Sequence, residues 1–333
     1  MNISIIVPNW NGSSYIEKCI NSLLEQSIKL NVIVVDNGSV DDSIKILKSY
    51  GKKIYLINLN TNIGFAGGVN VGIRKAMELY SPDYIGLLNN DAVADRKWVE
   101  NLISGFYKDT GIVTSLMLDA SGNRIDSTGE FYSKYGISYS RNRGDEYPKK
   151  LIPSGYVFGA SGGASIYRTI MLENIGLFDE DFFAYYEDVD ISFRARLNGW
   201  QIKYQPEAIV YHQIGATSRK LKGFTTYQTM KNLPWLLIKN VPLKYLFQTI
   251  LRFNLVYTTF LISSALRGEL IYALKGMLMS VILIPKKLVE RHGIQKSRKI
   301  RASELWKLVV NDLPPNAYKL RKIRKILSLG NLK

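Results

Sequence analysis

Two groups of acidic residues in the sequence lie where they could do chemistry. Asn89, Asn90 and Asp91 directly follow the apolar run 85–88, so two amides and a carboxylate lie at the end of an expected strand. Carboxylate and amide oxygens are ligands of hard cations, and such a cation commonly neutralises a diphosphate. A strand-end aspartate is equally common as a helix N-cap, so this pattern alone leaves both interpretations open.

The second group is Glu187 and Asp188, which follow two tyrosines and precede a third acid. Neighbouring carboxylates raise one another's pKa when they are desolvated, whereas the positive end of a helix that begins here would keep them ionised. An ionised carboxylate in this position can accept the proton of a sugar hydroxyl as a general base. The alternative is a capped helix whose acids pair with Arg194 or Arg196.

Three further features could bind a metal, an anion or a second substrate. His212 follows the apolar run 208–211 and is a candidate metal ligand or phosphate contact, although a lone histidine is more often structural. The glycine-rich stretch 62–72 is neither a dinucleotide fingerprint nor a P-loop, but it opens an expected helix whose N–H groups could face an anion, with Arg74 one turn later. The small residues 159–164 could let an acceptor approach the backbone or form a close-packed strand.

The elements that must position these residues alternate between strand and helix along the first 115 residues. Apolar runs predict strands at 3–7, 32–35, 54–57 and 84–88, and helical spacing predicts helices at 15–26, 42–50, 68–79 and 98–106. Later helices are expected at 168–174 and 187–198, and strands at 202–204 and 208–211. Short, wholly apolar strands between helices predict a mostly parallel sheet covered on both faces. Such sheets bind ligands at the carboxyl ends of their strands, where the polar clusters fall.

Charge divides the chain near residue 218. The sequence has 44 Lys+Arg and 28 Asp+Glu; residues 1–218 have a net charge of −3, and residues 219–333 of +19. A length of 333 residues with 46% hydrophobic content excludes a disordered chain, and the single cysteine, Cys19, excludes an intrachain disulfide framework. The N-terminus lacks the features of a signal peptide, so a cytoplasmic location is expected. We therefore expect a near-neutral domain at 1–218 and a basic helical region at 219–333.

The basic region interleaves Lys and Arg with apolar and aromatic residues. Its longest charge-free stretches, 253–266 and 276–285, are shorter than the ~20 residues of a spanning helix. Amphipathic helices on an anionic membrane surface are therefore expected. A helical subdomain that packs on the core, or that buries a homodimer face, is the alternative. The candidate interfacial anchors are Trp235, Tyr245, Phe247, Phe253 and Tyr257.

In their order, these segments resemble the inverting glycosyltransferases of family 2, and most closely their rhamnosyltransferase branch. The matching segments are VPNWNG (7–12), VVDNGSVDDS (34–43), NIGFAGGVNVGI (62–73), LLNNDA (87–92), GASGGASIYR (159–168), FDEDFFAYYEDVDISFRAR (178–196) and VYHQIGATS (210–218). The resemblance covers residues 2 to about 218 closely and the basic region loosely. It implies the GT-A fold, a Rossmann-like α/β fold whose mostly parallel central sheet is flanked by helices, followed by the basic amphipathic helical region.

The resemblance also implies a role for each candidate residue. The residues that would bind the nucleotide sugar are Pro8, Asn9, Asn11, Asp36, Asn62, Gly67, Arg74, Asn90 and Asp91, with Asp36 accepting from a pyrimidine N3–H. Asp91 and His212 would hold Mg²⁺ or Mn²⁺, although Asn89 stands where the family's D-x-D motif has its first acid. Asp188, with Glu187 beside it, falls at the general-base position. The acceptor site would be shaped by Ser161, Gly162, Gly163 and Ala164.

The implied activity is inverting transfer of a sugar from a nucleoside-diphosphate donor to a hydroxyl of a glycan or lipid-linked glycan. The expected donor is dTDP-rhamnose, with a UDP-sugar as the second choice. The protein would be cytoplasmic and peripheral at the inner face of the cell membrane, without binding nucleic acid. Two other functions stay open: a nucleic-acid-binding protein that uses the basic region, and a catalytically silent scaffold of glycan assembly, for which Asn89 is the support.

Overall fold

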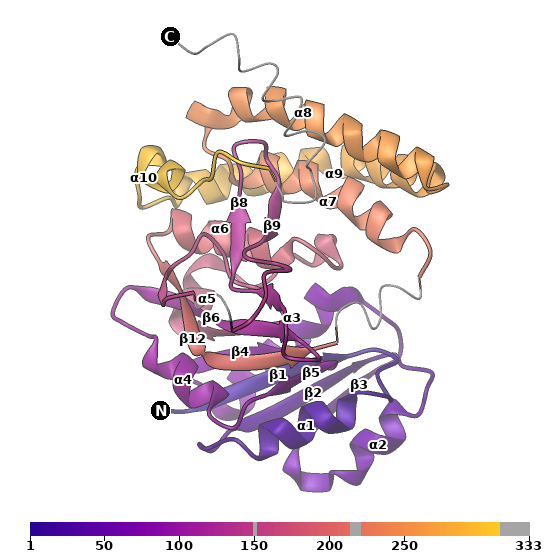
Figure 1. Ribbon diagram of the computed structural model, residues 1–333, viewed down its shortest axis with the longest axis vertical. Helices are drawn as coiled ribbons and strands as arrows, with labels where there is room; N and C mark the ends of the chain where they lie inside the picture. The colour runs from indigo at the N-terminus through magenta and orange to yellow at the C-terminus, as the bar shows by residue number, and fades with distance from the viewer. Residues whose placement is uncertain (149–151, 214–220, 314–333) are drawn as a thin grey trace.

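A central sheet with helices on both faces forms the body of the protein, and a layer of long helices lies beyond one of these faces (Figure 1). The structure, a computed structural model, describes residues 1–148, 152–213 and 221–313. In chain order the elements are β1 (Ile3–Asn9), α1 (Ile16–Leu24), β2 (Asn31–Asn37), α2 (Ser43–Ser49), η1 (Gly51–Lys53), β3 (Tyr55–Leu59), α3 (Gly64–Tyr80), β4 (Tyr84–Leu88), β5 (Ala92–Ala94), α4 (Trp98–Ser104), β6 (Thr110–Asp119), β7 (Ile125–Ser127), β8 (Glu130–Tyr132), β9 (Ser138–Ser140), β10 (Gly155–Tyr156), β11 (Ala164–Arg168), α5 (Thr169–Ile175), η2 (Glu180–Phe182), α6 (Glu187–Leu197), β12 (Gln201–His212), α7 (Phe224–Asn240), α8 (Leu243–Leu266), α9 (Leu270–Lys296) and α10 (Ala302–Lys307).

The sheet has the strand order β10-β12-β6-β11-β4-β1-β2-β3, with β5 paired to β12 and β7 to β6. Strands β3, β2, β1 and β4 are parallel, as their apolar runs predict. Strand β11 runs antiparallel to both β4 and β6, so this half of the sheet is mixed. The expected α/β architecture is confirmed, and the polar ends of β1, β2 and β4 lie at one edge.

The side chains of β1 alternate between two hydrophobic cores because successive residues of a strand point to opposite faces. Ile6 packs in the core that includes α3, α5 and α6, whereas Ile5 and Val7 pack in the core that includes α1 and α4. Cys19 is buried in this second core. Because both faces of the sheet are buried, these strands consist of consecutive apolar residues.

Two elements differ from the sequence-based expectation. Helix α3 begins at Gly64 instead of Gly68, although glycine disfavours helix. This helix lies so close to the sheet that a Cβ on Gly72 would be 2.4 Å from Cγ2 of Ile6, so small residues are required there for packing. The two strands expected at 202–204 and 208–211 are one strand, β12, in which a register shift absorbs the intervening residues.

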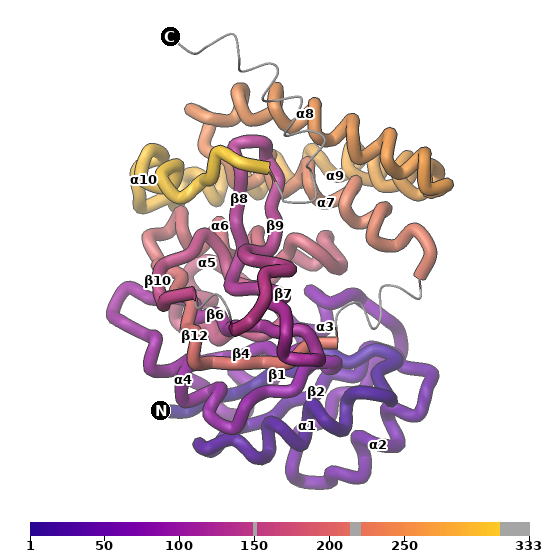
Figure 2. Tube along the Cα trace, in the orientation of Figure 1, coloured from indigo at the N-terminus to yellow at the C-terminus, as the bar shows by residue number. Residues whose placement is uncertain are grey.

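The C-terminal helices share a third hydrophobic core with the sheet-bound part of the chain. Buried Tyr132 of β8 and Phe193 of α6 pack in one cluster with Leu236 of α7. Figure 2 traces the β8–β9 hairpin from the sheet toward α10, where the N–H of Lys134 donates to the carbonyl of Val310 at 2.9 Å. The expected boundary at 218/219 falls at 214–220, outside the described residues.

The aromatic residues expected to anchor at a membrane mostly pack inside the protein. Trp235 is fully buried and Phe253 is 6% exposed, so the expectation is wrong for these two. Tyr245 and Tyr257 are half-buried, and Phe247 is 71% exposed. The other strongly exposed apolar side chains of α8 and α9 are aliphatic: Leu243, Leu251, Leu255, Ile262, Leu266, Ile271, Leu278, Val281, Ile282, Leu288 and Val289.

Helix α8 is, by length and composition alone, long and apolar enough to cross a membrane, and within the described residues it is the one such helix. It has 24 residues, and its most apolar 18-residue window has a mean hydropathy of 1.3 and is 22% buried. The charge-free stretches, at 14 and 10 residues, had predicted no membrane-spanning helix. The helix exceeds them because it continues through Arg252 to Leu243. Because core helices can meet the same criteria, this finding by itself does not establish a membrane span.

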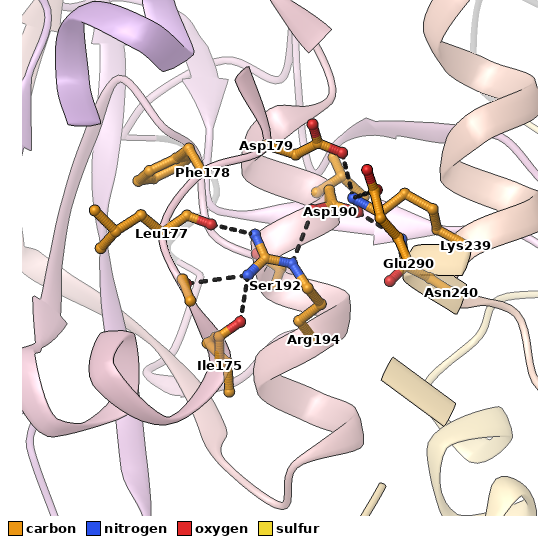
Figure 3. A network of polar contacts seen from close by, with 12 residues as sticks. Ile175, Leu177, Phe178, Asp179, Asp190, Ser192, Arg194, Lys239, Asn240 and Glu290 are labelled. Carbon is orange, nitrogen blue, oxygen red and sulfur yellow. Dashed lines mark hydrogen bonds and ion pairs between the residues drawn. The ribbon is translucent and has the colours of Figure 1, made fainter. Parts of the chain in front are cut away.

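A buried cluster of opposite charges joins α7 and α9 to the segment before α6, and Figure 3 shows part of it. Lys287 is fully buried, and its Nζ lies 2.7 Å from Asp179, 2.6 Å from Asp181 and 3.0 Å from Glu290. These three carboxylates are close enough together to bind a metal ion, but the Lys287 ammonium already lies among them. Burial raises the pKa of Asp179, but the charges of Lys239 and Lys287 outweigh it and lower that pKa overall.

The helix α6 is attached by the same kind of contact. Figure 3 shows Arg194, whose Nε donates to Oδ2 of Asp190 at 2.9 Å, while its other nitrogens donate to the carbonyls of Ile175 and Leu177. Lys239 Nζ lies 2.9 Å from the other oxygen of Asp190. The capped-helix interpretation therefore describes Asp190, whose carboxylate is fully buried and paired.

Replacing Lys287 by Met should lower the free energy of unfolding by about 3 kcal/mol, because it leaves buried carboxylates without their partner. Lys286→Met is the matched control: Lys286 Nζ also lies 2.6 Å from Asp181, but its side chain is 55% exposed. That variant should lose less than about 1 kcal/mol in urea unfolding at pH 7.

The effect of Lys287→Met should also depend on pH. The folded-state pKa values of Asp179 and Asp181 are lowered, so their contribution to stability is present above the unfolded pKa of about 4 and is lost as pH falls below it. The difference between wild type and Lys287→Met should therefore shrink in acid. Equal losses for Lys286→Met and Lys287→Met at pH 7 would contradict this account of the cluster.

Candidate active site

Three polar side chains form a hydrogen-bonded chain across the ends of three neighbouring strands. Asn9 of β1 donates from Nδ2 to Oδ1 of Asp36 on β2 at 2.7 Å, and its Oδ1 accepts from Nδ2 of Asn90, just past β4, at 2.7 Å. Asp36 is fully buried and also accepts from the N–H and hydroxyl of Ser39, at 2.9 and 2.7 Å. The structure therefore brings these three predicted residues together. Asp36 is enclosed by these contacts.

Gly12 and Asn11 belong to the loop that covers this chain of side chains. A Cβ on Gly12 would lie 2.2 Å from Nδ2 of Asn90, so the loop requires glycine there. Asn11 has a φ of 50°, its N–H donates to the Ser39 hydroxyl at 2.8 Å, and its Oδ1 accepts from the N–H of Val40 at 2.9 Å. Asn11 thus joins the loops after β1 and β2, and Pro8 lies half-buried within β1.

The glycine-rich segment is held by Asn37, which was not among the predicted site residues. Its Nδ2 donates to Oδ1 of Asn62 at 3.1 Å and to the carbonyl of Gly64 at 2.8 Å. Gly64 is the position in this segment that requires glycine, because its φ is 84° and a Cβ there would lie 2.6 Å from the carbonyl oxygen of Phe183. Gly67, the predicted residue, lies inside the first turns of α3.

Arg74 lies on an exposed side of α3 and is paired within the protein. Its Nη2 is 2.8 Å from Oε1 of Glu180, which also accepts from Nδ2 of Asn70 at 2.8 Å. Asn70 in turn accepts from the N–H of Phe178 at 3.0 Å. These contacts attach α3 to the segment that leads into α6, and a diphosphate would have to compete with Glu180 for the guanidinium.

Asp91 and His212 face each other, with Asp126 on the far side of the histidine. His212 Nδ1 lies 2.8 Å from Oδ2 of Asp126, and Nε2 lies 3.2 Å from Oδ1 of Asp91. The second oxygen of Asp126 accepts from Arg143 at 2.6 Å. Burial lowers the pKa of His212, but the hydrogen bonds with Asp126 and Asp91 outweigh it and raise that pKa to about 9. A proton on Nε2 would therefore have to leave before this nitrogen could bind a cation.

The donor set of Asp91 and His212 fits a divalent cation. Asp126 orients the ring so that Nε2 points toward the Asp91 carboxylate, and a carboxylate behind a histidine is the usual support of a metal-binding imidazole. Asn89 lies beside them, with its Nδ2 3.5 Å from Nε2 of His212. An asparagine there lowers the charge of the site, so diphosphate oxygens would have to supply further ligands.

Asp188 lies at the start of α6 against the backbone of the turn before β11. Its Oδ2 accepts from the N–H of Gly162 at 2.9 Å, and its Oδ1 accepts from the N–H of Val189 at 2.8 Å. A Cβ on Gly162 would lie 3.1 Å from Cβ of Asp188, and one on Gly163 would lie 3.0 Å from Nδ2 of Asn89. The backbone of this turn therefore lies directly between the Asp188 carboxylate and the side-chain amide of Asn89.

The other two residues predicted to shape the acceptor site support the same turn. The hydroxyl of Ser161 accepts from the N–H of Gly163 at 3.3 Å. Ala164 is fully buried in β11, where it pairs with Leu88 of β4. Of the four predicted residues, Gly162 is the one that the structure brings into hydrogen-bond contact with Asp188.

Two buried carboxyl groups lie near Asp188. Glu187 is 5% exposed. Its burial, and to a lesser degree the charge of Asp188, raise its pKa well above the ordinary value. Glu130 of β8 accepts from the Ser140 hydroxyl at 2.9 Å. Its burial, and to a lesser degree the charge of Asp188, raise its pKa to about 8. Burial also raises the pKa of Asp188, against the effect of its N–H donors. We assign the negative charge of this group to Asp188, and a raised pKa makes it a stronger base.

The turn before α6 has an unusual backbone. Phe183, Tyr185 and Tyr186 have φ values of 64°, 68° and 72°, and such values cost non-glycine residues about 1–3 kcal/mol each. The N–H of Ala184 donates to the carbonyl of Phe182 at 2.7 Å, which closes a γ-turn around Phe183. Strain of this kind persists where neighbouring contacts fix it, and it collects at functional sites.

Several residues that lie in the site were not identified from the sequence. Asn37 and Ser39 lie inside the matched segment 34–43, so the motif itself was the available signal. Asp126 and Glu130 lie in the irregular stretch between β6 and β11, where no periodicity or motif marks them. Their positions follow from the pairing of β7 with β6 and from the β8–β9 hairpin.

Known proteins resemble the chain in sequence and in fold. The sequence model of glycosyl transferase family 2 matches residues 4–176, which is more than half of the chain. Poly-β-1,6-N-acetyl-D-glucosamine synthase of Staphylococcus aureus is 26% identical over 222 residues, which cover 65% of this chain and 50% of that protein. The chain therefore matches about half the length of these curated relatives.

Two solved structures are similar to the chain in fold at low sequence identity. S. aureus TarS in complex with UDP-GlcNAc is 17% identical, with a TM-score of 0.57 over 89% of this chain and 91% of that one. The mannosyltransferase PcManGT from Pyrobaculum calidifontis, in complex with GDP-Man and Mn²⁺, is 14% identical, with a TM-score of 0.54 over 89% and 85%. The expected GT-A architecture is thus confirmed, and by its sequence match the chain belongs to glycosyl transferase family 2.

Proposed function

We propose that the chain is an inverting glycosyltransferase that moves a sugar from a nucleoside-diphosphate donor to a hydroxyl of a glycan or lipid-linked glycan. Asp188 acts as the general base and takes the proton of the acceptor hydroxyl while the oxygen attacks the anomeric carbon. The bond from that carbon to the diphosphate oxygen breaks, and the nucleoside diphosphate leaves with its electron pair. Attack opposite the leaving group inverts the carbon, so no enzyme nucleophile is needed.

The observation that carries the proposal is the contact of one short turn with both halves of the site. Gly162 donates to the Asp188 carboxylate, and the next residue, Gly163, accepts from the N–H of Asn89 at 2.9 Å. The base and the strand-end loop of Asp91 are therefore both anchored to the same turn. Direct displacement at a sugar carbon needs a base and a bound donor held close together, and this shared turn supports that arrangement.

The donor is proposed to bind at the carboxyl edge of β1, β2 and β4. Either dTDP-rhamnose, which the rhamnosyltransferase-like motifs favour, or a UDP-sugar, the donor class in the TarS complex, fits a pyrimidine site at Asp36. Asp91 and His212 would hold Mg²⁺ or Mn²⁺, which would neutralise charge on the leaving diphosphate. Glu187 is buried and its pKa is raised well above the ordinary value, so we give it a supporting role beside Asp188.

The basic helical region is proposed to attach the protein to the anionic inner face of the cell membrane. The exposed faces of α8 and α9 are rich in aliphatic side chains, as listed above, and these two helices carry seven Lys and Arg residues against one acid, Glu290. Apolar burial and attraction to anionic lipid both favour this attachment. A homodimer that buries the same surface is the alternative outcome of the test below.

A donor panel tests the reaction. Binding of dTDP-rhamnose, UDP-GlcNAc or GDP-mannose with Mn²⁺ should raise the melting temperature, because a ligand that binds only the folded state stabilises it. Asp188→Asn should lower donor turnover by about 10²–10⁴-fold, the usual contribution of a general base, while the melting shift with donor persists. Because the pKa of Asp188 is raised, wild-type kcat should fall with acid at a pH above the ordinary value of about 4.

Two results would oppose this account of the reaction. Near-normal turnover by Asp188→Asn would remove this residue from the mechanism. The absence of any melting shift or donor hydrolysis with added Mn²⁺ would favour the catalytically silent scaffold.

The metal site has its own test. His212→Gln should weaken Mn²⁺ binding in the presence of UDP by about tenfold or more, measured by electron paramagnetic resonance of free Mn²⁺. Affinity in wild type should rise as pH rises toward 9, because a proton on Nε2 competes with the cation. His292→Gln is the control, since His292 is exposed on α9. Equal affinities of the two variants would exclude His212 as a ligand.

If the exposed face of α8 binds a membrane, acidic residues placed on that face should weaken the binding. Leu251→Glu combined with Leu255→Glu should lower partition into phosphatidylglycerol vesicles more than tenfold, because each leucine contributes about 1.5–3 kcal/mol when buried. Ile170→Glu, at a 51% exposed position of α5, should leave partition unchanged. Unchanged flotation of the double variant would contradict membrane attachment, and a simultaneous change from dimer to monomer would favour the homodimer.

A further inference from the structure

One buried amide from the C-terminal helices holds the strained turn that precedes Asp188. Asn232 of α7 is fully buried, and its Nδ2 lies 3.0, 2.9 and 2.8 Å from the carbonyl oxygens of Phe182, Ala184 and Tyr185. Two N–H bonds are thus shared among three carbonyls. Since all three neighbours are acceptors, the amide must direct its nitrogen toward the turn, and its Oδ1 is left without a partner.

The same turn is held from its other side by the donor-side segment. The carbonyl of Phe183 accepts from the N–H of Ala66 in the first turn of α3, at 3.2 Å. Gly64 leaves the space for this approach. Lys231, next to Asn232, adds a contact from its Nζ to the carbonyl of Asp181 at 2.8 Å. The turn therefore lies between the glycine-rich segment and α7, and α6 with Asp188 begins directly after it.

We propose that Asn232 is a positioning residue for the reaction, fixing the turn at 182–186 so that Asp188 faces the donor. This inference rests on the proposed function, because it assigns the general base to Asp188. It gives the basic C-terminal region a part in the active site that is separate from any contact with lipid. Positive φ values at three residues of the turn mean that other backbone conformations are available once the amide is removed.

Asn232→Leu tests the proposal, because it keeps the volume and removes both donors. Backbone amides of residues 183–190, several of which are hydrogen-bonded within this turn, should exchange with deuterium about tenfold faster or more. Donor hydrolysis should fall about 100-fold in kcat with donor KM within about threefold, since a small displacement of a catalytic group has an effect of this order. Asn232→Ser is the second variant, for use where Asn232→Leu does not fold.

Gln228→Met is the matched control. Gln228 lies one turn earlier on α7 and is also buried, but among the described residues its side chain makes no hydrogen bond to the turn at 182–186. It should change neither exchange at 183–190 nor kcat. Unchanged exchange or unchanged kcat in the Asn232 variants would overturn the proposal, as would equal effects in Gln228→Met. If wild type hydrolyses none of the three donors, the proposed function fails, and the exchange measurement alone decides whether Asn232 holds the turn.

Discussion

The side chain of Asn9 connects three parallel strands, and the geometry of the candidate active site depends on this connection. Its amide donates to Asp36 and accepts from Asn90, so each end of the amide has one fixed role. Buried polar groups stabilise a structure only when all of them are paired. Gly12 covers the pair, and a side chain there would break it. The loop that carries Asp91 therefore has a defined place relative to the second strand.

The second half of the site depends on the antiparallel strand β11. By lying between β4 and β6, this strand brings the Gly162–Gly163 turn beside the end of β4. A parallel strand in this position would present its opposite end. The change of direction within the sheet is thus what allows a backbone N–H to meet Asp188 while the adjacent carbonyl meets Asn89.

The sequence predicted well what local patterns encode. Apolar runs and ordered motifs identified the parallel strands, the strand-end residues Asn9, Asp36 and Asn90, and the pair of Asp91 and His212, which are 121 positions apart and 3.2 Å apart in space. It could not identify Asp126, Glu130 or Asn232, because their environment arises only from tertiary pairing. Trp235 was misassigned because aromatic residues among lysines are typical both of membrane surfaces and of helices that pack together, and composition does not encode exposure.

The core shared by β8, α6 and α7 has a consequence for how this protein can be divided in the laboratory. The match to the family's sequence model ends at residue 176, before α6 begins, whereas Phe193 and Leu236 lie in one packed cluster. A recombinant fragment cut at the limit of similarity would lack the proposed base and would leave Tyr132 uncovered. The sequence-model match and the packed core therefore end at different residues, and shortened versions should retain the chain at least through Leu313.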